Sequence, residues 1–132
     1  MYNYQYSYLV TETDLRNLLN EAHCRLERTA SFIVRYPFIP DCFAEVHVLQ
    51  TRLVGLLPSQ QIVAHTDPPI AGVRYHLPLQ TNPGCWSFSA GVWQQLEVGK
   101  VYQVDPSEVH GAVNWGTEVR LHLMIDVDAV QA

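Results

Sequence analysis

The C-terminal half of this sequence carries two histidines, an aspartate and an arginine whose types and spacing suit metal-dependent oxidation. His65 and Asp67 form a His-Thr-Asp motif. His110 follows further along the chain, and Arg120 comes ten residues after it. Two imidazoles and a carboxylate can bind one face of an Fe(II) ion and leave its other positions open, and a guanidinium suits the carboxylate of a 2-oxo acid. The combination predicts an Fe(II) oxygenase that consumes a 2-oxo acid and dioxygen.

Alternation along extended segments places several of these side chains on common faces. His65 and Asp67 are two residues apart, so both side chains leave the same face of a strand. The chain must then reverse at Pro68-Pro69. On the returning segment, Arg74 lies level with Asp67, and His76 lies level with His65. The pattern leaves open whether these partners belong to one sheet or face each other across two.

The end of the chain shows a second set of level positions. Arg120 lies level with His110 about a turn at 114–116, where Asn-Trp-Gly supplies turn residues. His122 is a further polar group that could reach the same cavity. Polar and charged side chains within apolar strands are costly unless they are paired or bind a metal. We therefore expect these groups to converge on one site.

Each of these residues taken alone also has an ordinary structural interpretation. A single histidine on a strand is more often hydrogen-bonded in place than bound to a metal. Asp67 before a proline suits a turn, and Arg74 and Arg120 suit surface ion pairs. The agreement in spacing is what favours a functional site.

The elements that must position these residues are mostly strands. Strict alternation at the start of the chain predicts a strand with an aromatic face, made of Tyr2, Tyr4, Tyr6 and Tyr8. Packing of that face on the core or on a second copy of the chain is favoured over a substrate wall. Apolar residues at helical spacing predict an amphipathic helix over 13–28, with Thr13 as its N-cap. Three tryptophans could border the substrate entrance, with core packing preferred for the first two: Trp86, Trp93 and Trp115.

After the helix, short apolar segments alternate with turn residues at intervals of about ten residues. The predicted strands cover 31–36, 44–57, 61–66, 73–80, 85–89, 92–97, 100–104, 109–113 and 118–127. Many short strands of this kind are typical of a sandwich or a barrel-like jelly roll. We therefore expect a mainly β, single-domain chain over 1–132, with the N-terminal strand and helix in 1–30 and the jelly roll in 31–127.

Composition narrows the class of protein further. The chain has 132 residues, 48% of them apolar and 16% charged, and a net charge of −5 without a clustered basic face. These values predict a globular protein that binds no nucleic acid. No signal peptide or stretch of roughly 20 apolar residues is recognisable, so a cytoplasmic protein without a membrane partner is expected. The cysteines are expected to be reduced and mostly buried: Cys24, Cys42 and Cys85.

The same polar residues are where the chain resembles the aspartyl/asparaginyl β-hydroxylase family of Fe(II)- and 2-oxoglutarate-dependent dioxygenases. The resemblance covers about 53–127 and rests on several spaced motifs in the family's order. These are His65-Thr66-Asp67, Arg74-Tyr75-His76-Leu77-Pro78-Leu79, Trp93, Glu97-Val98-Gly99-Lys100, His110, Asn114, Arg120-Leu121-His122-Leu123 and Asp126-Val127. The fold that the resemblance implies is the double-stranded β-helix, or cupin jelly roll.

The resemblance also implies roles for individual residues. His65, Asp67 and His110 correspond to the iron ligands. Arg120 corresponds to the arginine that binds the distal carboxylate of 2-oxoglutarate.

The resemblance also assigns residues near the other carboxylate of 2-oxoglutarate. Arg74 and His76 correspond to the pair near the other carboxylate of 2-oxoglutarate. Val54 stands where some members of the family have a serine that bonds the co-substrate.

The activity implied by the resemblance is hydroxylation of a C–H bond in an amino acid or in an Asp/Asn-type peptide residue, with release of succinate and carbon dioxide. A small molecule or short peptide is the expected substrate, and a homodimer is compatible with the tyrosine-rich strand. The alternatives are a non-catalytic cupin that binds a metal or small ligand, and a cupin enzyme that uses a metal without 2-oxoglutarate. A cysteine nucleophile is disfavoured because neither Cys24 nor Cys85 has a recognisable base.

Overall fold

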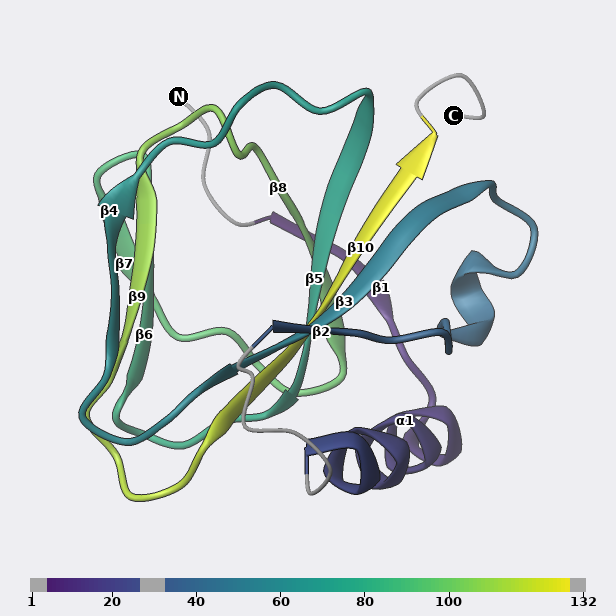
Figure 1. Ribbon diagram of the computed structural model, residues 1–132, viewed down its shortest axis with the longest axis horizontal. Helices are drawn as coiled ribbons and strands as arrows, with labels where there is room; N and C mark the ends of the chain where they lie inside the picture. Colours follow the sequence, from purple (N-terminus) through teal and green to yellow (C-terminus); the bar gives the residue numbers. More distant parts are fainter. Residues whose placement is uncertain (1–4, 27–32, 129–132) are drawn as a thin grey trace.

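Strands fold into two antiparallel sheets that face each other, with a helix outside the larger one (Figure 1). The computed structural model describes residues 5–26 and 33–128. In the larger sheet, the strands in spatial order are β1 (Gln5–Leu9), β8 (Lys100–Val104), β5 (Gly72–Gln80), β10 (Arg120–Asp128), β3 (Val48–Leu56) and β2 (Ile33–Arg35). In the smaller sheet they are β4 (Gln61–His65), β9 (His110–Asn114), β6 (Cys85–Ser89) and β7 (Val92–Gln94). The predicted mainly β fold is confirmed.

Two of the predicted strands are shorter than the sequence pattern indicated. The strand expected from residue 44 begins at Val48, because a 3₁₀ turn η1 (Asp41–Phe43) precedes it. The amide of Val46 still bonds back to the carbonyl of Phe43 at 3.2 Å, which keeps this segment out of the ladder. The strand expected over 92–97 ends at Gln94.

The helix α1 (Glu12–Leu26) confirms the amphipathic helix but corrects its cap. The hydroxyl of Thr11 accepts a hydrogen bond from the amide of Asp14 at 3.2 Å, as an N-cap residue does. Thr13 lies inside the first turn, so its prediction as N-cap was wrong. The predicted end of the helix at 28 lies outside the described residues, as do the side chains of the predicted tyrosine face.

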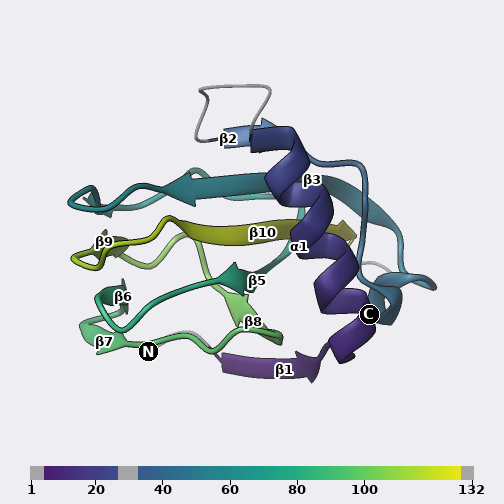
Figure 2. The ribbon, with the colours of Figure 1, turned by 90° about the horizontal axis from the view of Figure 1, so that it is seen from below.

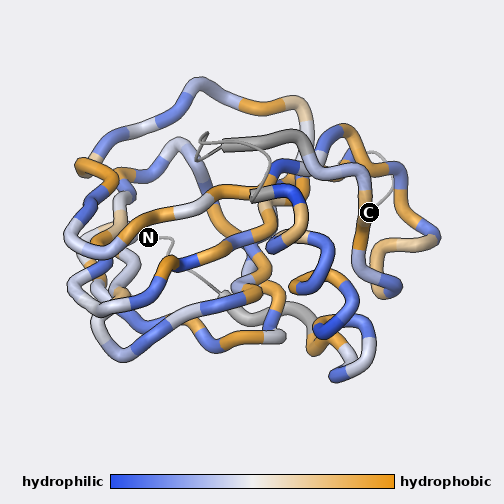
Figure 3. Tube along the Cα trace, turned by 60° about the horizontal axis from the view of Figure 1, so that its bottom comes forward, coloured by the Kyte–Doolittle hydropathy of each residue, from blue (hydrophilic) through white to orange (hydrophobic). Residues whose placement is uncertain are grey.

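Strand β10 lies between β3 and β5 and has two chemically different faces. One face is apolar and fully buried: Leu121, Leu123 and Ile125 are each 0% exposed. The opposite face carries Arg120, His122, Met124 and Asp126. Figure 3 shows hydrophilic and hydrophobic positions interleaved along the strands. This alternation gives the larger sheet a core face and a polar face that looks toward the smaller sheet.

The helix covers the core face of the larger sheet (Figure 2). Leu18 and Ala22 of α1 are buried in the same cluster as the apolar residues of β10. Tyr36, which follows β2 and is 0% exposed, donates a hydrogen bond from its hydroxyl to the carbonyl of Leu18 at 2.6 Å. Burial raises the pKa of Tyr36, so this phenol stays a donor. The hydroxyl ties the helix to the sheet.

The described residues include no helix with the length and apolar character needed to cross a bilayer. The three cysteines are free thiols. Cys85 is buried as expected, Cys24 is partly buried and Cys42 is exposed. The expectation of burial was therefore wrong for Cys42.

We predict that Tyr36→Phe destabilises the protein by roughly 0.5–1.5 kcal/mol, the usual net contribution of a buried neutral hydrogen bond. The ring still fills its site, so only the bond to the carbonyl of Leu18 is removed. Urea denaturation followed by circular dichroism measures the difference. An unchanged midpoint would show that the helix is held by apolar packing alone.

Candidate functional site

A cavity of about 510 Å³ lies between the polar face of the larger sheet and the smaller sheet. Its size is in the range of small-molecule binding sites. Six of the polar residues predicted from the sequence line this cavity: His65, Asp67, Arg74, His76, His110 and Arg120. His122, the further group expected to reach it, does not line it. The level positions inferred from strand alternation therefore face each other across two sheets.

The two histidines of the smaller sheet are direct neighbours on paired strands. His65 on β4 is the register partner of His110 on β9, and their ring centroids are 4.4 Å apart. An irregularity in β4 between Ile62 and His65 produces this register. Gly111 permits the close approach, because a Cβ there would lie 2.6 Å from the carbonyl oxygen of Ile62. Alternation within one segment did not predict this pairing.

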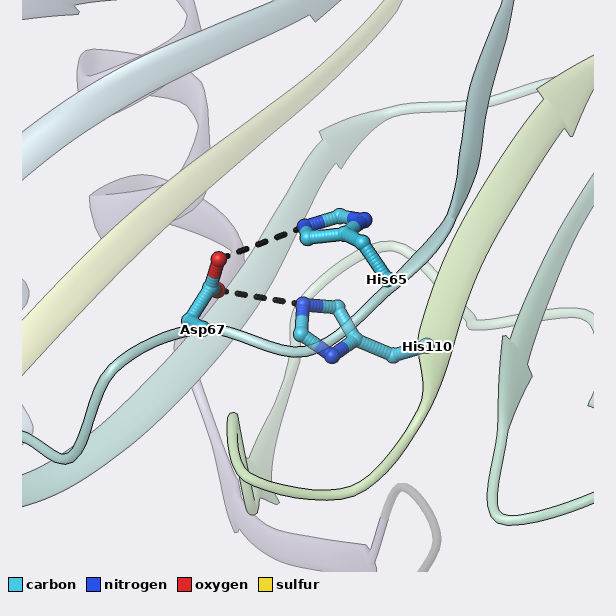
Figure 4. Close-up of side chains that lie close together, drawn as sticks. All are labelled: His65, Asp67 and His110. Carbon is cyan, nitrogen blue, oxygen red and sulfur yellow. Dashed lines mark ion pairs between the residues drawn. The ribbon is translucent and has the colours of Figure 1, made fainter.

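Asp67 completes a compact cluster with the two histidines (Figure 4). Its Oδ1 lies 3.3 Å from Nε2 of His65, and its Oδ2 lies 3.2 Å from Nε2 of His110. The amide of Asp67 donates to the carbonyl of Pro106 at 2.9 Å, which fixes the backbone just beyond β4. One ligand atom from each of the three residues lies within 4.8 Å of the others. The spacing suits a single metal ion.

The outer hydrogen bonds of the histidines determine which ring nitrogen is available. Nδ1 of His65 lies 2.6 Å from the carbonyl of Val63, and Nδ1 of His110 lies 2.8 Å from the carbonyl of Glu108. A carbonyl oxygen can only accept, so both Nδ1 atoms carry protons and donate. In neutral rings, both Nε2 atoms then present lone pairs.

This protonation pattern is the test of whether the three residues fit a metal. Two nitrogen lone pairs and a carboxylate face one another at 3.2 and 3.3 Å, and none of these atoms carries a proton when the rings are neutral. Such an arrangement of acceptors is repulsive unless a cation lies among them or the rings are protonated. Nitrogen and carboxylate donors with ordered outer hydrogen bonds suit a divalent transition metal. The donor set fits.

Arg74 is held between two carboxylates. Its Nε and Nη2 donate to the two oxygens of Asp126 at 2.8 and 3.1 Å, and its Nη1 lies 3.4 Å from Oδ2 of Asp67. Gln50 donates to Asp126 at 2.8 Å. Burial alone would raise the pKa of Asp126, but the hydrogen bonds from Arg74 and Gln50 outweigh it and hold that pKa below its usual value.

Asp126 was not among the predicted site residues, although the sequence contains a signal for it. It interrupts the apolar end of β10 and shares its face with Arg120 and His122, both of which lie an even number of positions before it. A carboxylate in that position needs a partner. The register supplies it, since Asp126 is paired with Arg74 on β5.

His76, which is part-buried and lines the cavity, is paired with the buried His122. Their Nδ1 atoms are 3.2 Å apart, so one ring donates and the other accepts, and the rings meet edge to face. Burial first, and then the charge of Arg120, lowers the pKa of His76 to about 3 and that of His122 well below its usual value. Both rings are therefore neutral near pH 7.

Two further arginines contribute positive charge to the cavity. Arg120 is 3% exposed and lines it together with Val54. Arg52 of β3 also lines it, on the same face of that strand as Val54 and Gln50. Within the described part of the chain, no hydrogen bond or ion pair of Arg52 is found. Its charge contributes to lowering the pKa of Asp126, without a hydrogen bond to that carboxylate.

The tryptophans do not border the cavity. Trp86, Trp93 and Trp115 are 40%, 53% and 60% exposed, and none of them lines it. Trp93 packs on Phe88 with ring centroids 5.0 Å apart, on strands of the smaller sheet. Both expectations, core packing for the first two and a place at the substrate entrance, were wrong. Trp86 alternates with buried residues of β6, and Trp93 pairs with Phe88 on the same face, so both lie on the outer side of that sheet. Trp115 lies in the segment that follows β9.

Comparison with known sequences confirms the resemblance identified from the motifs. Residues 6–129 match the sequence profile of the family described as aspartyl/asparaginyl β-hydroxylase. A 92-residue stretch is 33% identical to an L-proline cis-4-hydroxylase of Rhizobium meliloti (strain 1021), covering 67% of this chain and 32% of that relative. The chain thus spans about a third of the length of the curated relative that it matches.

Solved structures support the same architecture. A prolyl-4-hydroxylase of Pseudomonas putida aligns with a TM-score of 0.68 at 16% identity, covering 97% of this chain and 92% of that chain. A cupin domain from Bordetella pertussis Tohama I aligns with a TM-score of 0.51 at 16% identity, covering 76% and 98%. At these identities the likeness concerns the fold, which is the predicted double-stranded β-helix of cupins.

We predict that the stability of the protein falls as the pH decreases from 7 to 4. His76 and His122 stay neutral in the folded state, whereas in the unfolded chain they take up protons near pH 6.5. Unfolding therefore binds protons throughout this range, and each ring can remove up to about 1.4 kcal/mol per pH unit. Urea denaturation at several pH values measures the slope.

The variant His122→Asn should flatten this slope, because one buried imidazole is lost while a polar side chain remains. His23→Asn is the matched control, since His23 is an exposed histidine whose ring lies 3.1 Å from the side-chain oxygen of Gln80. Equal slopes in wild type and His122→Asn would mean that the buried pair does not control the acid sensitivity.

Proposed function

Because the chain belongs to the aspartyl/asparaginyl β-hydroxylase family, we propose that it is an Fe(II)- and 2-oxoglutarate-dependent hydroxylase of a small amino acid. The observation that carries the proposal is the cluster of two imidazole nitrogens and one carboxylate at 3.2 and 3.3 Å, at a cavity that also contains arginines. A binding module would have no need of a carboxylate-binding cation beside such a cluster.

His65, Asp67 and His110 would hold the iron. With 2-oxoglutarate and dioxygen, the iron would supply the oxidation that replaces a C–H bond by C–OH, while the 2-oxo acid becomes succinate and carbon dioxide. The protein contributes orientation of the three ligands through the carbonyls of Val63 and Glu108. These bonds keep both Nε2 atoms directed at the metal position.

Arg120 would bind the distal carboxylate of 2-oxoglutarate. Its guanidinium is almost fully buried, and its charge lowers the pKa of the neighbouring His76 and His122, so the field extends over the cavity floor. A planar guanidinium can donate two parallel hydrogen bonds to a carboxylate. Val54, in place of a hydroxyl, adds an apolar wall there and no donor.

Arg52 would bind the carboxylate of the substrate. It lines the same cavity, and no ion pair holds it within the described residues. A free amino acid offers such a carboxylate, whereas a residue inside a peptide has lost its α-carboxylate. The relative named L-proline cis-4-hydroxylase makes proline the first substrate to test. Apolar side chains of Ile62 and Met124 line the remaining wall and exclude water.

We predict that the wild-type protein forms succinate and adds one oxygen atom to an amino acid when it is supplied with Fe(II), 2-oxoglutarate and air. Mass spectrometry across a panel of amino acids that includes proline detects the product. His110→Ala should abolish turnover because it removes a metal ligand, whereas His47→Ala, which removes an exposed histidine near Asp128, should retain it. Succinate at the level of a metal-free sample, across the whole panel, would refute the proposed activity.

Variants of Arg120 and Arg52 should affect the binding of 2-oxoglutarate and of the amino acid separately. We predict that Arg120→Lys weakens 2-oxoglutarate binding at least about 10-fold, since a lysine keeps the charge but loses the two-pronged contact. Arg52→Lys should leave that affinity unchanged and raise the KM for the amino acid. Calorimetry with Mn(II) in place of Fe(II) measures the first, and steady-state kinetics the second. Metal binding without any 2-oxoglutarate binding in the wild type would instead indicate a metal-binding cupin.

A further inference from the structure

We infer that Asp126 is a positioning residue for the metal-binding carboxylate of Asp67 and acts through Arg74. The inference rests on the proposed metal site and goes beyond it, because it concerns two residues that would not touch the metal.

The guanidinium of Arg74 joins the two carboxylates directly. Its Nε and Nη2 bind both oxygens of Asp126 side by side at 2.8 and 3.1 Å. The remaining nitrogen, Nη1, lies 3.4 Å from Oδ2 of Asp67. Because the guanidinium is planar and rigid, the two bonds to Asp126 determine where Nη1 lies. The orientation of Asp126 is thereby transmitted to one oxygen of Asp67.

The backbone fixes the other end of this connection. Gln50 on β3, Asp126 on β10 and Arg74 on β5 are register partners in adjacent strands of the larger sheet. The amide of Gln50 donates to Oδ2 of Asp126 at 2.8 Å, so three hydrogen bonds hold this carboxylate. A side chain held this way inside a paired sheet cannot rotate freely.

Burial decreases along the connection toward the cavity. The side chains of Asp126 and Arg74 are 5% and 8% exposed, whereas that of Asp67 is 31% exposed. Charged hydrogen bonds are strongest where water is excluded. The bonds of Arg74 to the buried Asp126 are therefore stronger than its contact with the more exposed Asp67. The ligand keeps its solvent-accessible side for the metal.

The charges lead to the same conclusion. The negative charge of Asp126 compensates the positive charge of Arg74, so Asp67 retains its own negative charge for a cation. Without that compensation, the buried guanidinium would turn to Asp67, its other carboxylate neighbour. Arg74 would then compete with the metal for the same oxygens. Geometry and charge therefore both make Asp126 a determinant of metal affinity.

The test is a calorimetric titration of the apoprotein with Mn(II), without 2-oxoglutarate or substrate. We expect Asp126→Asn to bind Mn(II) about 10- to 100-fold more weakly than the wild type, the usual effect of losing a group that orients a metal ligand. The matched control is Asp128→Asn. This carboxylate lies two residues later on β10, contacts His47 at 3.4 Å and does not line the cavity. It should bind Mn(II) like the wild type.

A spectrum separates positioning from a general loss of structure. In the Co(II)-loaded protein, the visible absorption of Asp126→Asn should shift toward that of Asp67→Ala. The first change loosens the carboxylate ligand of Asp67, and the second removes it. If Asp126→Asn does not fold, Gln50→Ala decides, since it removes one of the three hydrogen bonds to Asp126 and should weaken Mn(II) binding by a smaller factor. Wild-type Mn(II) affinity in the folded variant would overturn the inference.

The outcomes distinguish this inference from the proposed function. A wild-type protein that binds no Mn(II) would refute the metal site itself, and the inference with it. A wild type that binds Mn(II), with equal affinity in Asp126→Asn, would overturn only the role of Asp126. Arg74 would then have only the role that the family resemblance predicts, close to a carboxylate of 2-oxoglutarate.

Discussion

The pairing of β10 with both β3 and β5 is the constraint on which the rest of the molecule depends. This strand places Leu121, Leu123 and Ile125 in the core under α1. Its opposite face carries Arg120, His122 and Asp126, of which Arg120 lines the cavity. A slip of one residue in its register would exchange the two sets and place charges in the core. The hydrogen bonds between these three strands thus bury the core and also fix the polar side chains at the site. A change in the strand register would therefore alter both the stability of the protein and the geometry of the site. The smaller sheet then has only to place His65 and His110, together with Asp67 just beyond β4, opposite these polar residues.

The fold could be predicted well from the sequence because both of its signals are local. Alternating apolar residues and regular turns identify the strands, and the helical spacing of Leu15, Leu18 and Ala22 identifies α1. The boundaries failed where local hydrogen bonds compete with the ladder. The turn after Phe43 delays β3, and Thr11 caps the helix before the residue that the pattern favoured. The outward tryptophans were misjudged because large apolar residues usually pack inside, while these lie on the open face of the smaller sheet.

The candidate site could be predicted as a set of residues but not as a geometry. Counting positions about a reversal placed Arg74 opposite Asp67, and the structure has these side chains 3.4 Å apart. The same counting could not show that His65 and His110 are register partners, because that depends on which strands of the smaller sheet pair and on the close approach at Gly111. Asp126 was missed for a related reason. Its partner Arg74 lies 52 residues away, and only the order of strands in the larger sheet brings them together.

The distribution of charge in the cavity shows how one small site could serve two anions and a cation. Arg74 is neutralised by Asp126, so it adds little net charge to the cavity. Arg120 and Arg52 also line the cavity, and in the proposed reaction each would bind one carboxylate. His76 and His122 stay neutral because burial and Arg120 lower their pKa values, so they do not add to the positive charge near the metal position. Asp67 therefore supplies the carboxylate beside the two imidazoles of the cluster, which is the kind of donor set that a divalent metal requires. A protonated histidine pair beside the cavity would repel the metal, so the conditions that keep these rings neutral serve the site as much as the fold.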